Sequence, residues 1–137
     1  MKNKKDYNVE ELANDYKRAV ADYRNLKRRS EEEKEKIIKL ANERLILNML
    51  EVLDDLEESL KHLDNAEGVD KVVEKFISKL ENEGLDVIDP KDKDFNPNEH
   101  EALEITDGKK GKVMKVYRKG YKLFDKVVRP ALVAVGK

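Results

Sequence analysis

The chain has 137 residues, of which 43% are charged and 39% are hydrophobic. A compact domain has about a quarter of its residues charged, so this composition predicts an elongated helical protein with much solvated surface. The 29 basic and 30 acidic residues nearly cancel, which disfavours a nucleic-acid partner, because nucleic-acid-binding proteins usually carry a basic excess. With no cysteine in the sequence, disulfides and thiolate metal sites are excluded. No apolar run reaches the length of a membrane span and the N-terminus does not resemble a signal peptide, so we expect a cytoplasmic protein without a membrane partner.

The first predicted element is a long helix that pairs with a second copy of itself. Its apolar residues recur in alternating steps of three and four, which is the pattern of a coiled-coil seam: they are Val9, Leu12, Tyr16, Ala19, Tyr23 and Leu26. The seam is weak, because Ala and Tyr pack less well there than Leu and Ile, and residues 27–36 contain no apolar side chain. No Gly or Pro occurs in residues 1–67, so nothing in the composition predicts a break. One helix over residues 7–63 would extend roughly 85 Å.

A helical hairpin is expected next. Residues 37–63 carry an apolar stripe that is wider than a two-stranded seam requires, and residues 69–80 carry a second amphipathic helix. Residues 64–68 are expected to form the turn between them, and Gly84 is expected to stop the second helix. Two such hairpins would bury their wide apolar faces as a dimeric four-helix bundle. The residues expected at the dimer interface, stalk included, are Leu12, Tyr16, Tyr23, Leu45, Met49, Leu50, Leu53, Leu56, Leu60, Gly68, Val73, Phe76 and Leu80.

Beyond Gly84 the sequence indicates strands and turns. Alternating or short apolar segments predict strands at residues 85–88, 102–105 and 113–117, and in one or two pieces over 127–135, where Pro130 forces an edge or a bend. Residues 119–137 resemble a closing hairpin with a basic turn at Asp125 and Lys126. The predicted fold class is therefore α+β: a paired helical stalk (1–39), a hairpin that forms the dimeric bundle (40–84), and a small β-domain (85–137) that contacts another protein.

The sequence shows no group of residues with the types and spacing of an enzyme active site, a cofactor site or a metal site. His62 and His100 lack ligand spacing, and His100, between two glutamates, is expected to cap or pack locally. The alternating Asp and Lys residues of 91–94 lack the calcium-loop pattern, and the glycines lack a phosphate-binding spacing. Lys27-Arg28-Arg29 could contact phosphates, but the acids of residues 31–33 follow at once, so a solvated helix face is favoured.

Three segments, in this order, resemble the GrpE family, the nucleotide exchange factors of DnaK-type chaperones. They are residues 23–29 (YRNLKRR), residues 95–102 (FNPNEHEA), and residues 120–135, which begin Gly-Tyr and continue through Arg129-Pro130-Ala131 to Val133 and Val135. Residues 47–56 and 68–84 are similar to the two helices of the family's bundle. Each segment is weak alone, but the set covers most of the chain.

The resemblance implies a parallel homodimer with paired long helices, a four-helix bundle and two β-domains. One β-domain would bind the nucleotide-binding domain of the chaperone and hold its cleft open, so that ADP leaves and ATP rebinds during protein folding and heat stress. Residue by residue, it implies chaperone contacts at or beside Lys27, Lys36, Pro97, Tyr117, Lys126, Arg129 and Val135, and it aligns Gly68 with a glycine on which chaperone binding depends. The family's long acidic tail is almost absent before residue 9, and Lys126 replaces a frequent Arg.

Other classes of function compete with this interpretation. A coiled-coil scaffold or adaptor would share the dimer but would leave the C-terminal motif unexplained. A nucleic-acid-associated protein using Lys27-Arg28-Arg29 is disfavoured by the near-neutral charge. An enzyme is the class that the sequence favours least.

Overall fold

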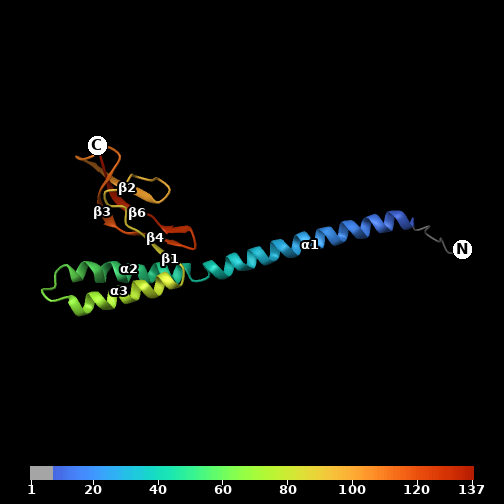
Figure 1. Cartoon of the computed structure of the whole chain (residues 1–137), viewed down its shortest axis with the longest axis horizontal. Coiled ribbons are helices and arrows are strands. Elements are labelled where there is room, and N and C mark those ends of the chain that lie inside the picture. The colour runs from blue at the N-terminus through green and yellow to red at the C-terminus, as the bar shows by residue number, and fades with distance from the viewer. Residues whose placement is uncertain (1–7) are drawn as a thin grey trace. The chain divides into compact units, whose positions relative to one another are not determined.

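The computed structural model describes residues 8–137, which divide into two compact units. The boundary along the chain lies between Lys39 and Leu40. The first unit is helix α1 (Val9–Leu40) up to Lys39. The second contains helices α2 (Glu43–Leu60) and α3 (Glu67–Asn82), followed by six strands (Figure 1). The α+β class predicted from the sequence is confirmed.

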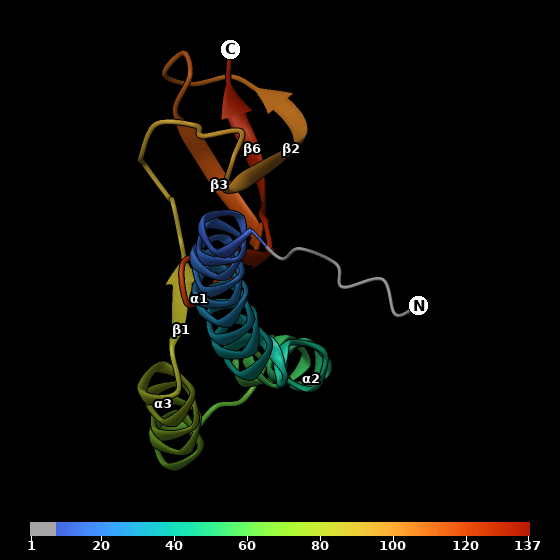
Figure 2. The ribbon, with the colours of Figure 1, turned by 90° about the vertical axis from the view of Figure 1, so that its right-hand side faces the viewer.

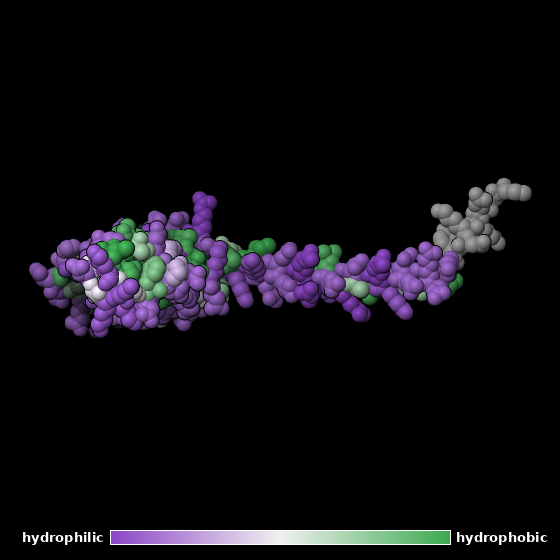
Figure 3. Space-filling model, turned by 90° about the horizontal axis from the view of Figure 1, so that it is seen from above, coloured by the Kyte–Doolittle hydropathy of each residue, from purple (hydrophilic) through white to green (hydrophobic). Residues whose placement is uncertain are grey.

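Helix α1 is a single uninterrupted helix with a defined start. The Oδ1 atom of Asn8 accepts hydrogen bonds from the backbone N–H groups of Glu10 (3.0 Å) and Glu11 (3.4 Å), so Asn8 caps the first turn. The two glutamates also favour the positive end of the helix dipole. No side chain of α1 is buried, and Figure 3 shows it as a hydrophilic rod with isolated apolar patches. Pairing of its seam with a second copy stays a prediction.

The stalk helix and the hairpin are separated by a turn, although neither Gly nor Pro marks it in the sequence. Helix α1 ends at Leu40, Ala41 and Asn42 form a turn, and α2 begins at Glu43. Asn42 has φ −94° and ψ 2°, a conformation at the edge of the helical region, and its carbonyl accepts the first hydrogen bond of α2 from Ile46 N–H at 2.8 Å. Asn favours such positions because it competes locally for backbone hydrogen bonds. The predicted start at residue 7 lies outside the described residues.

Helices α2 and α3 form the predicted hairpin with one change at the turn. Gly68 lies inside the first turn of α3, because that helix begins at Glu67 and not after residue 68. The expected stop at Gly84 is confirmed: its φ is +100°, and its N–H donates to the carbonyl of Glu81 at 3.0 Å. An added Cβ at Gly84 would lie 2.5 Å from the Phe124 ring, so glycine also makes room for that side chain.

The strands form two three-stranded sheets. The first sheet has the order β1 (Leu85–Ile88), β4 (Gly120–Leu123), β5 (Lys126–Arg129), and all its pairs are antiparallel. In the second sheet β6 (Ala131–Gly136) lies between β2 (His100–Thr106), to which it is parallel, and β3 (Val113–Arg118), to which it is antiparallel. The strands predicted at residues 85–88, 102–105 and 113–117 are confirmed within one or two residues, whereas β4 was not predicted separately.

The closing segment differs from a simple hairpin. Strands β4 and β5 form a hairpin in the first sheet, with its turn at Phe124 and Asp125, both at positive φ (46° and 68°), and not at Asp125 and Lys126. The chain then bends at Pro130, as expected, and continues as the central strand of the second sheet. The last segment therefore connects the two sheets.

Residues 40–137 contain two apolar cores. The first core joins the helical hairpin to the first sheet and contains Ile46, Leu50, Leu53, Val73, Leu85, Tyr121 and Leu123. The second core joins Ile88 of β1, in the first sheet, to Val113, Ala131 and Val133 of the second sheet. Figure 2 shows α2 and α3 at one end of this unit and β2, β3 and β6 at the other. Residues of β1 and β4 share the first core with residues of α2 and α3, so the first sheet packs directly on the hairpin.

Candidate partner-binding surface

The two basic residues predicted on the closing hairpin both contact α2. The ammonium group of Lys126 lies 2.8 and 3.2 Å from the carboxylate oxygens of Glu43, and the Lys126 side chain is half exposed. Arg129 is only 7% exposed, and its guanidinium donates two hydrogen bonds to the Asp54 carboxylate, at 2.5 and 2.9 Å. Of the two, Lys126 has the charge that solvent or a partner can reach.

Arg129 has further contacts that make it an internal anchor. Its Nε and Nη2 atoms donate to the backbone carbonyl of Lys119 at 3.1 and 2.7 Å. The guanidinium carbon lies 5.0 Å from the centre of the Tyr121 ring, within the range of a cation–π contact. A guanidinium with so many partners fixes the backbone around it, so Arg129 supports the surface instead of facing a partner.

Three carboxylates of α2 receive basic groups from the β-strand region, and sequence reasoning missed all three. Glu43 pairs with Lys126, Asp54 with Arg129, and Glu57 with Lys119 at 3.3 Å. The spacings of eleven and three residues place these acids on one side of a helix, because eleven residues make three turns. That spacing could have indicated an acidic face, although its basic partners lie more than sixty residues away.

Tyr121 lies beneath this ionic layer. It is fully buried, and among the described residues its hydroxyl has no hydrogen-bond partner. Burial, together with the negative charges of Glu57 and Asp54, raises the pKa of Tyr121 to about 12, although the Arg129 charge acts in the opposite direction. The hydroxyl therefore stays neutral at physiological pH.

The remaining β-domain candidates lie on or beside the second sheet. Tyr117 on β3 is partly exposed; its hydroxyl donates to Glu104 on β2, and this hydrogen bond raises the pKa of Tyr117. The ammonium group of Lys115 lies 4.8 Å from the centre of the Tyr117 ring. Val135 on β6 is partly buried against the second core, and Pro97 is exposed in the loop before β2.

The loop that contains Pro97 is held by His100. The Nδ1 atom of His100 accepts a hydrogen bond from Asn96 N–H at 2.9 Å, and the carbonyl of Asn96 accepts from His100 N–H at 2.8 Å. The imidazole lies 5.8 Å from the Phe95 ring, centre to centre. Burial lowers the pKa of His100, which suits a ring nitrogen that must accept a hydrogen bond. The expectation that His100 caps and packs locally is confirmed.

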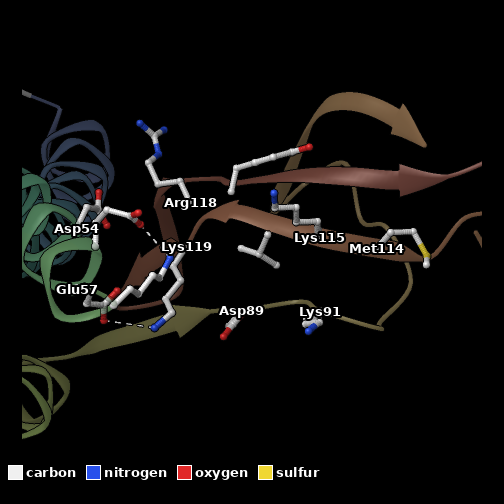
Figure 4. Close-up of a pocket in the computed structure, with 12 residues that line it drawn as sticks. Asp54, Glu57, Asp89, Lys91, Met114, Lys115, Arg118 and Lys119 are labelled. Carbon is white, nitrogen blue, oxygen red and sulfur yellow. Dashed lines mark hydrogen bonds and ion pairs between the residues drawn. The ribbon is translucent and has the colours of Figure 1, made fainter. Parts of the chain in front are cut away.

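An open cleft of about 510 Å³ separates α2 from β3. Figure 4 shows Asp54 and Glu57 on α2 at one end, with Lys119 reaching toward them, while Lys115 and Arg118 lie along β3. Asp89 and Lys91 complete the lining on the side of the loop after β1. The cleft presents charges of both signs, and within residues 8–137 no group of three metal-ligating side chains occurs.

Comparison with known proteins identifies the family of this chain. The GrpE family model matches residues 2–137. The chain belongs to the GrpE family. It is 37% identical to Protein GrpE of Brachyspira hyodysenteriae over 139 residues, which cover 93% of this chain and 70% of that protein. It is 36% identical to Protein GrpE of Methanosphaera stadtmanae over 135 residues (94% and 78%), and 37% identical to that of Clostridioides difficile over 135 residues (93% and 66%).

In this GrpE-family chain the hairpin carries an apolar groove on the surface. The groove has a volume of about 350 Å³ and is lined by Met49, Val52, Leu53, Leu56, Val72, Val73 and Phe76. Among the predicted interface residues, Leu45 and Leu56 are exposed, whereas Leu50, Leu53 and Val73 are buried in the chain's own first core. The most exposed residues of the groove, Val52 (68%) and Val72 (63%), were not among those predicted.

The other predicted residues lie as follows. Lys27 and Lys36 are exposed on α1, as are Leu12, Tyr16 and Tyr23. Leu60, Phe76 and Leu80 pack partly against the first core, and Met49 lines the groove. Gly68 is exposed, and an added Cβ there would meet no atom of the protein within 4 Å. Within residues 8–137 no helix has the length and apolarity needed to cross a membrane.

Proposed function

We propose that this GrpE-family chain is an adenine nucleotide exchange factor for a DnaK-type chaperone. Membership of the family, which extends over residues 2–137, is the observation that carries this proposal. The chain would bind the nucleotide-binding domain of the chaperone, stabilise its open cleft and accelerate release of ADP. This function requires binding surfaces and no catalytic residue.

The physical basis of such an activity is differential binding. A protein that binds the open form of a cleft better than the closed, ADP-bound form shifts the equilibrium toward the open form. By linkage, ADP must weaken binding of the exchange factor by the same factor. A thousandfold drop in nucleotide affinity corresponds to about 4 kcal/mol of coupling free energy. A few apolar contacts and one charge pair can supply this amount.

The β-domain offers exposed groups of the required kinds. Lys126 presents an ammonium group that is held but not covered by Glu43. Pro97 and Tyr117 present exposed apolar and aromatic surface, and Val135 lies on the central strand, partly buried. On α1, Lys27 and Lys36 are exposed basic groups for further contacts. Arg129 is assigned a supporting role, because its guanidinium is buried against Asp54.

The active form in this proposal is a homodimer. The apolar groove on α2 and α3 leaves Val52 and Val72 largely exposed, and the same groove on a second copy is its expected occupant. Two hairpins packed through these grooves would make a four-helix bundle. Pairing of two α1 helices along the residues from Val9 to Leu26 would continue the same dimer.

The decisive experiment measures release of a fluorescent ADP analogue from a DnaK-type chaperone. We expect this chain to accelerate release at micromolar concentration, and replacement of Lys126 by Ala to lower the acceleration without changing the oligomeric state. The matched control is Lys75→Ala, which removes an exposed lysine of α3. If the wild-type chain forms dimers but does not accelerate release, the coiled-coil scaffold becomes the better assignment.

A further inference from the structure

The chain passes between the two sheets three times, and the last two of these connections lie against each other. Lys119 connects β3 to β4, and Pro130 connects β5 to β6. At Gly120 an added Cβ would lie 2.4 Å from the backbone nitrogen of Ala131 and 2.8 Å from the carbonyl oxygen of Arg129. The two connections are therefore in backbone contact, and together they form one crossing between the sheets.

Two ion pairs join this crossing to α2: Lys119 with Glu57 at 3.3 Å, and Arg129 with Asp54, of which only the second is bidentate. Arg129 is the last residue of β5, and its Nε and Nη2 atoms hold the carbonyl of Lys119 on the other connection. Its Nη1 and Nη2 atoms bind the two carboxylate oxygens of Asp54. A planar guanidinium bound in this bidentate way restricts orientation as well as distance. Asp54 thus reaches both connections of the crossing through one side chain.

The residues proposed to contact the chaperone are divided by this crossing. Lys126 belongs to the first sheet, which shares its core with the helical hairpin. Tyr117 and Val135 belong to the second sheet, whose core does not include the helices, and Pro97 lies in the loop that leads into it. A partner that contacts both groups at once requires the second sheet to keep one position relative to α2.

We propose that Asp54 and Arg129 form a positioning pair that holds the second sheet in the orientation needed for chaperone binding. This inference rests on the exchange function proposed above. Without the Asp54 carboxylate, the guanidinium retains the Lys119 carbonyl but loses α2, and the crossing is left with the longer, single-contact Lys119–Glu57 pair. The second sheet then samples more orientations, and a partner must select the productive one at a cost in affinity.

The structural part of the proposal can be tested without any chaperone. The chain has no cysteine, so spin labels can be placed at Lys75→Cys on α3 and Glu101→Cys on β2, both exposed positions. Labelled chains are mixed with excess unlabelled chain, so that distances within one chain dominate the measurement by double electron–electron resonance. Asp54→Asn is expected to broaden the distance distribution, and Arg129→Lys is expected to do the same.

The matched control is Asp55→Asn, which removes the neighbouring carboxylate. Asp55 is exposed, and its backbone carbonyl accepts a hydrogen bond from the Ser59 hydroxyl at 2.8 Å. This control is expected to keep the wild-type distribution. A distribution that is unchanged in both Asp54→Asn and Arg129→Lys would overturn the proposal, and circular dichroism verifies that all variants are folded.

The functional part uses the nucleotide-release measurement. For Asp54→Asn we expect the concentration giving half-maximal acceleration to rise roughly tenfold while the maximal rate is retained, because the productive orientation remains accessible. Asp55→Asn should stay within about twofold of wild type, and Asp54→Asn combined with Arg129→Lys should lose no more than the worse single variant. A half-maximal concentration for Asp54→Asn within twofold of wild type would contradict the positioning role. Absence of acceleration by the wild-type chain would instead contradict the exchange function, and the spin-label result would be unaffected.

Discussion

At the scale of single residues, His100 links the acidity of the solution to the stability of the β-domain. Its Nδ1 atom accepts a backbone hydrogen bond, and burial lowers its pKa below the ordinary value of about 6.5. The unfolded chain therefore takes up the proton more readily than the folded chain. The stability that this site contributes is fully present above about pH 6.5 and is lost as the pH falls from there toward the lowered pKa.

We expect the free energy of unfolding to decline as the pH falls from 7.5 to 5.5, measured by urea denaturation at constant salt. His100→Asn keeps a short side-chain acceptor but cannot be protonated, so this variant should show a flatter pH dependence. It should also be less stable by about 1–2 kcal/mol at pH 7.5, because packing against Phe95 is lost. His62→Gln, at an exposed position of the same chain, is the control. An equal slope in His100→Asn and wild type would refute this account.

Two glycines should respond in opposite directions to the same substitution. Gly120→Ala places a Cβ 2.4 Å from a backbone nitrogen at the crossing of the sheets, where no side-chain motion can relieve the overlap. We expect it to destabilise the protein by about 2–3 kcal/mol. Gly68→Ala meets nothing within 4 Å and lies in a helix, so it should stabilise the protein by about 0.5–1 kcal/mol.

Thermal and urea unfolding of the two glycine variants would measure both effects. A stabilised Gly68→Ala variant that loses nucleotide exchange would show that an external partner, and not the fold, requires glycine there. A destabilised Gly68→Ala variant, or a neutral Gly120→Ala variant, would contradict the geometry at these positions.

Single residues also mark where the sequence is informative and where it is not. Lys126 and Arg129 could be selected from the sequence, because both lie in a local motif of the closing segment. The difference in their exposure could not be predicted, because it depends on Asp54, which lies seventy-five positions away from Arg129. A local sequence pattern contains no information about a tertiary ion pair. The sequence alone therefore predicts the same exposure for Lys126, which is exposed, as for Arg129, which is buried.

At the scale of elements, period and turn chemistry explain what was predicted correctly. Strands β1 and β3 have alternating apolar residues, and α3 ends at a glycine with positive φ. Strand β4 was missed because its four residues include the fully buried Tyr121 beside Lys122, without a clear alternation. The turn between α1 and α2 was missed because Asn42 is a weak signal when neither Gly nor Pro accompanies it.

The exposed groove of the hairpin leads to a prediction about assembly. Val52→Asp combined with Val72→Asp places two carboxylates in the apolar groove of each chain. Burial of unpaired charges in a dimer interface costs several kcal/mol, and about 4 kcal/mol corresponds to a roughly 1,000-fold weaker dimer. The monomer should keep its fold, because both valines are largely exposed within one chain.

Sedimentation velocity over a dilution series would measure this change in association. Ser78→Asp, at an exposed position of α3 outside the groove, adds a carboxylate to the same helix and should leave the dimer intact. A Val52→Asp, Val72→Asp variant that stays dimeric at the same concentrations as wild type would show that the groove is not the dimer interface.

At the scale of the whole molecule, the two units differ in what stabilises them. Residues 40–137 have two apolar cores, whereas α1 has no buried side chain in one chain. A helix without tertiary contacts depends on its propensity and on a partner. We therefore expect calorimetry to show two transitions, with the α1 unit melting first, and a single sharp transition would contradict this.

The polar stretch of α1 allows the origin of the lower transition to be tested. Counting on from Leu26 in steps of four and three gives Ser30, Glu33, Ile37 and Leu40, so the seam keeps its phase across residues 27–36. Glu33 would then face its own copy in a parallel dimer, whereas Glu35 would point outward.

Glu33→Leu replaces a repelling pair by an apolar one and should raise the lower melting temperature by roughly 5–10 °C, while the upper transition stays unchanged. Glu35→Leu removes the same charge from the same helix and should change the lower transition by no more than about 2 °C. Equal increases for both variants would mean that helix propensity, and not pairing along this seam, determines when the stalk melts.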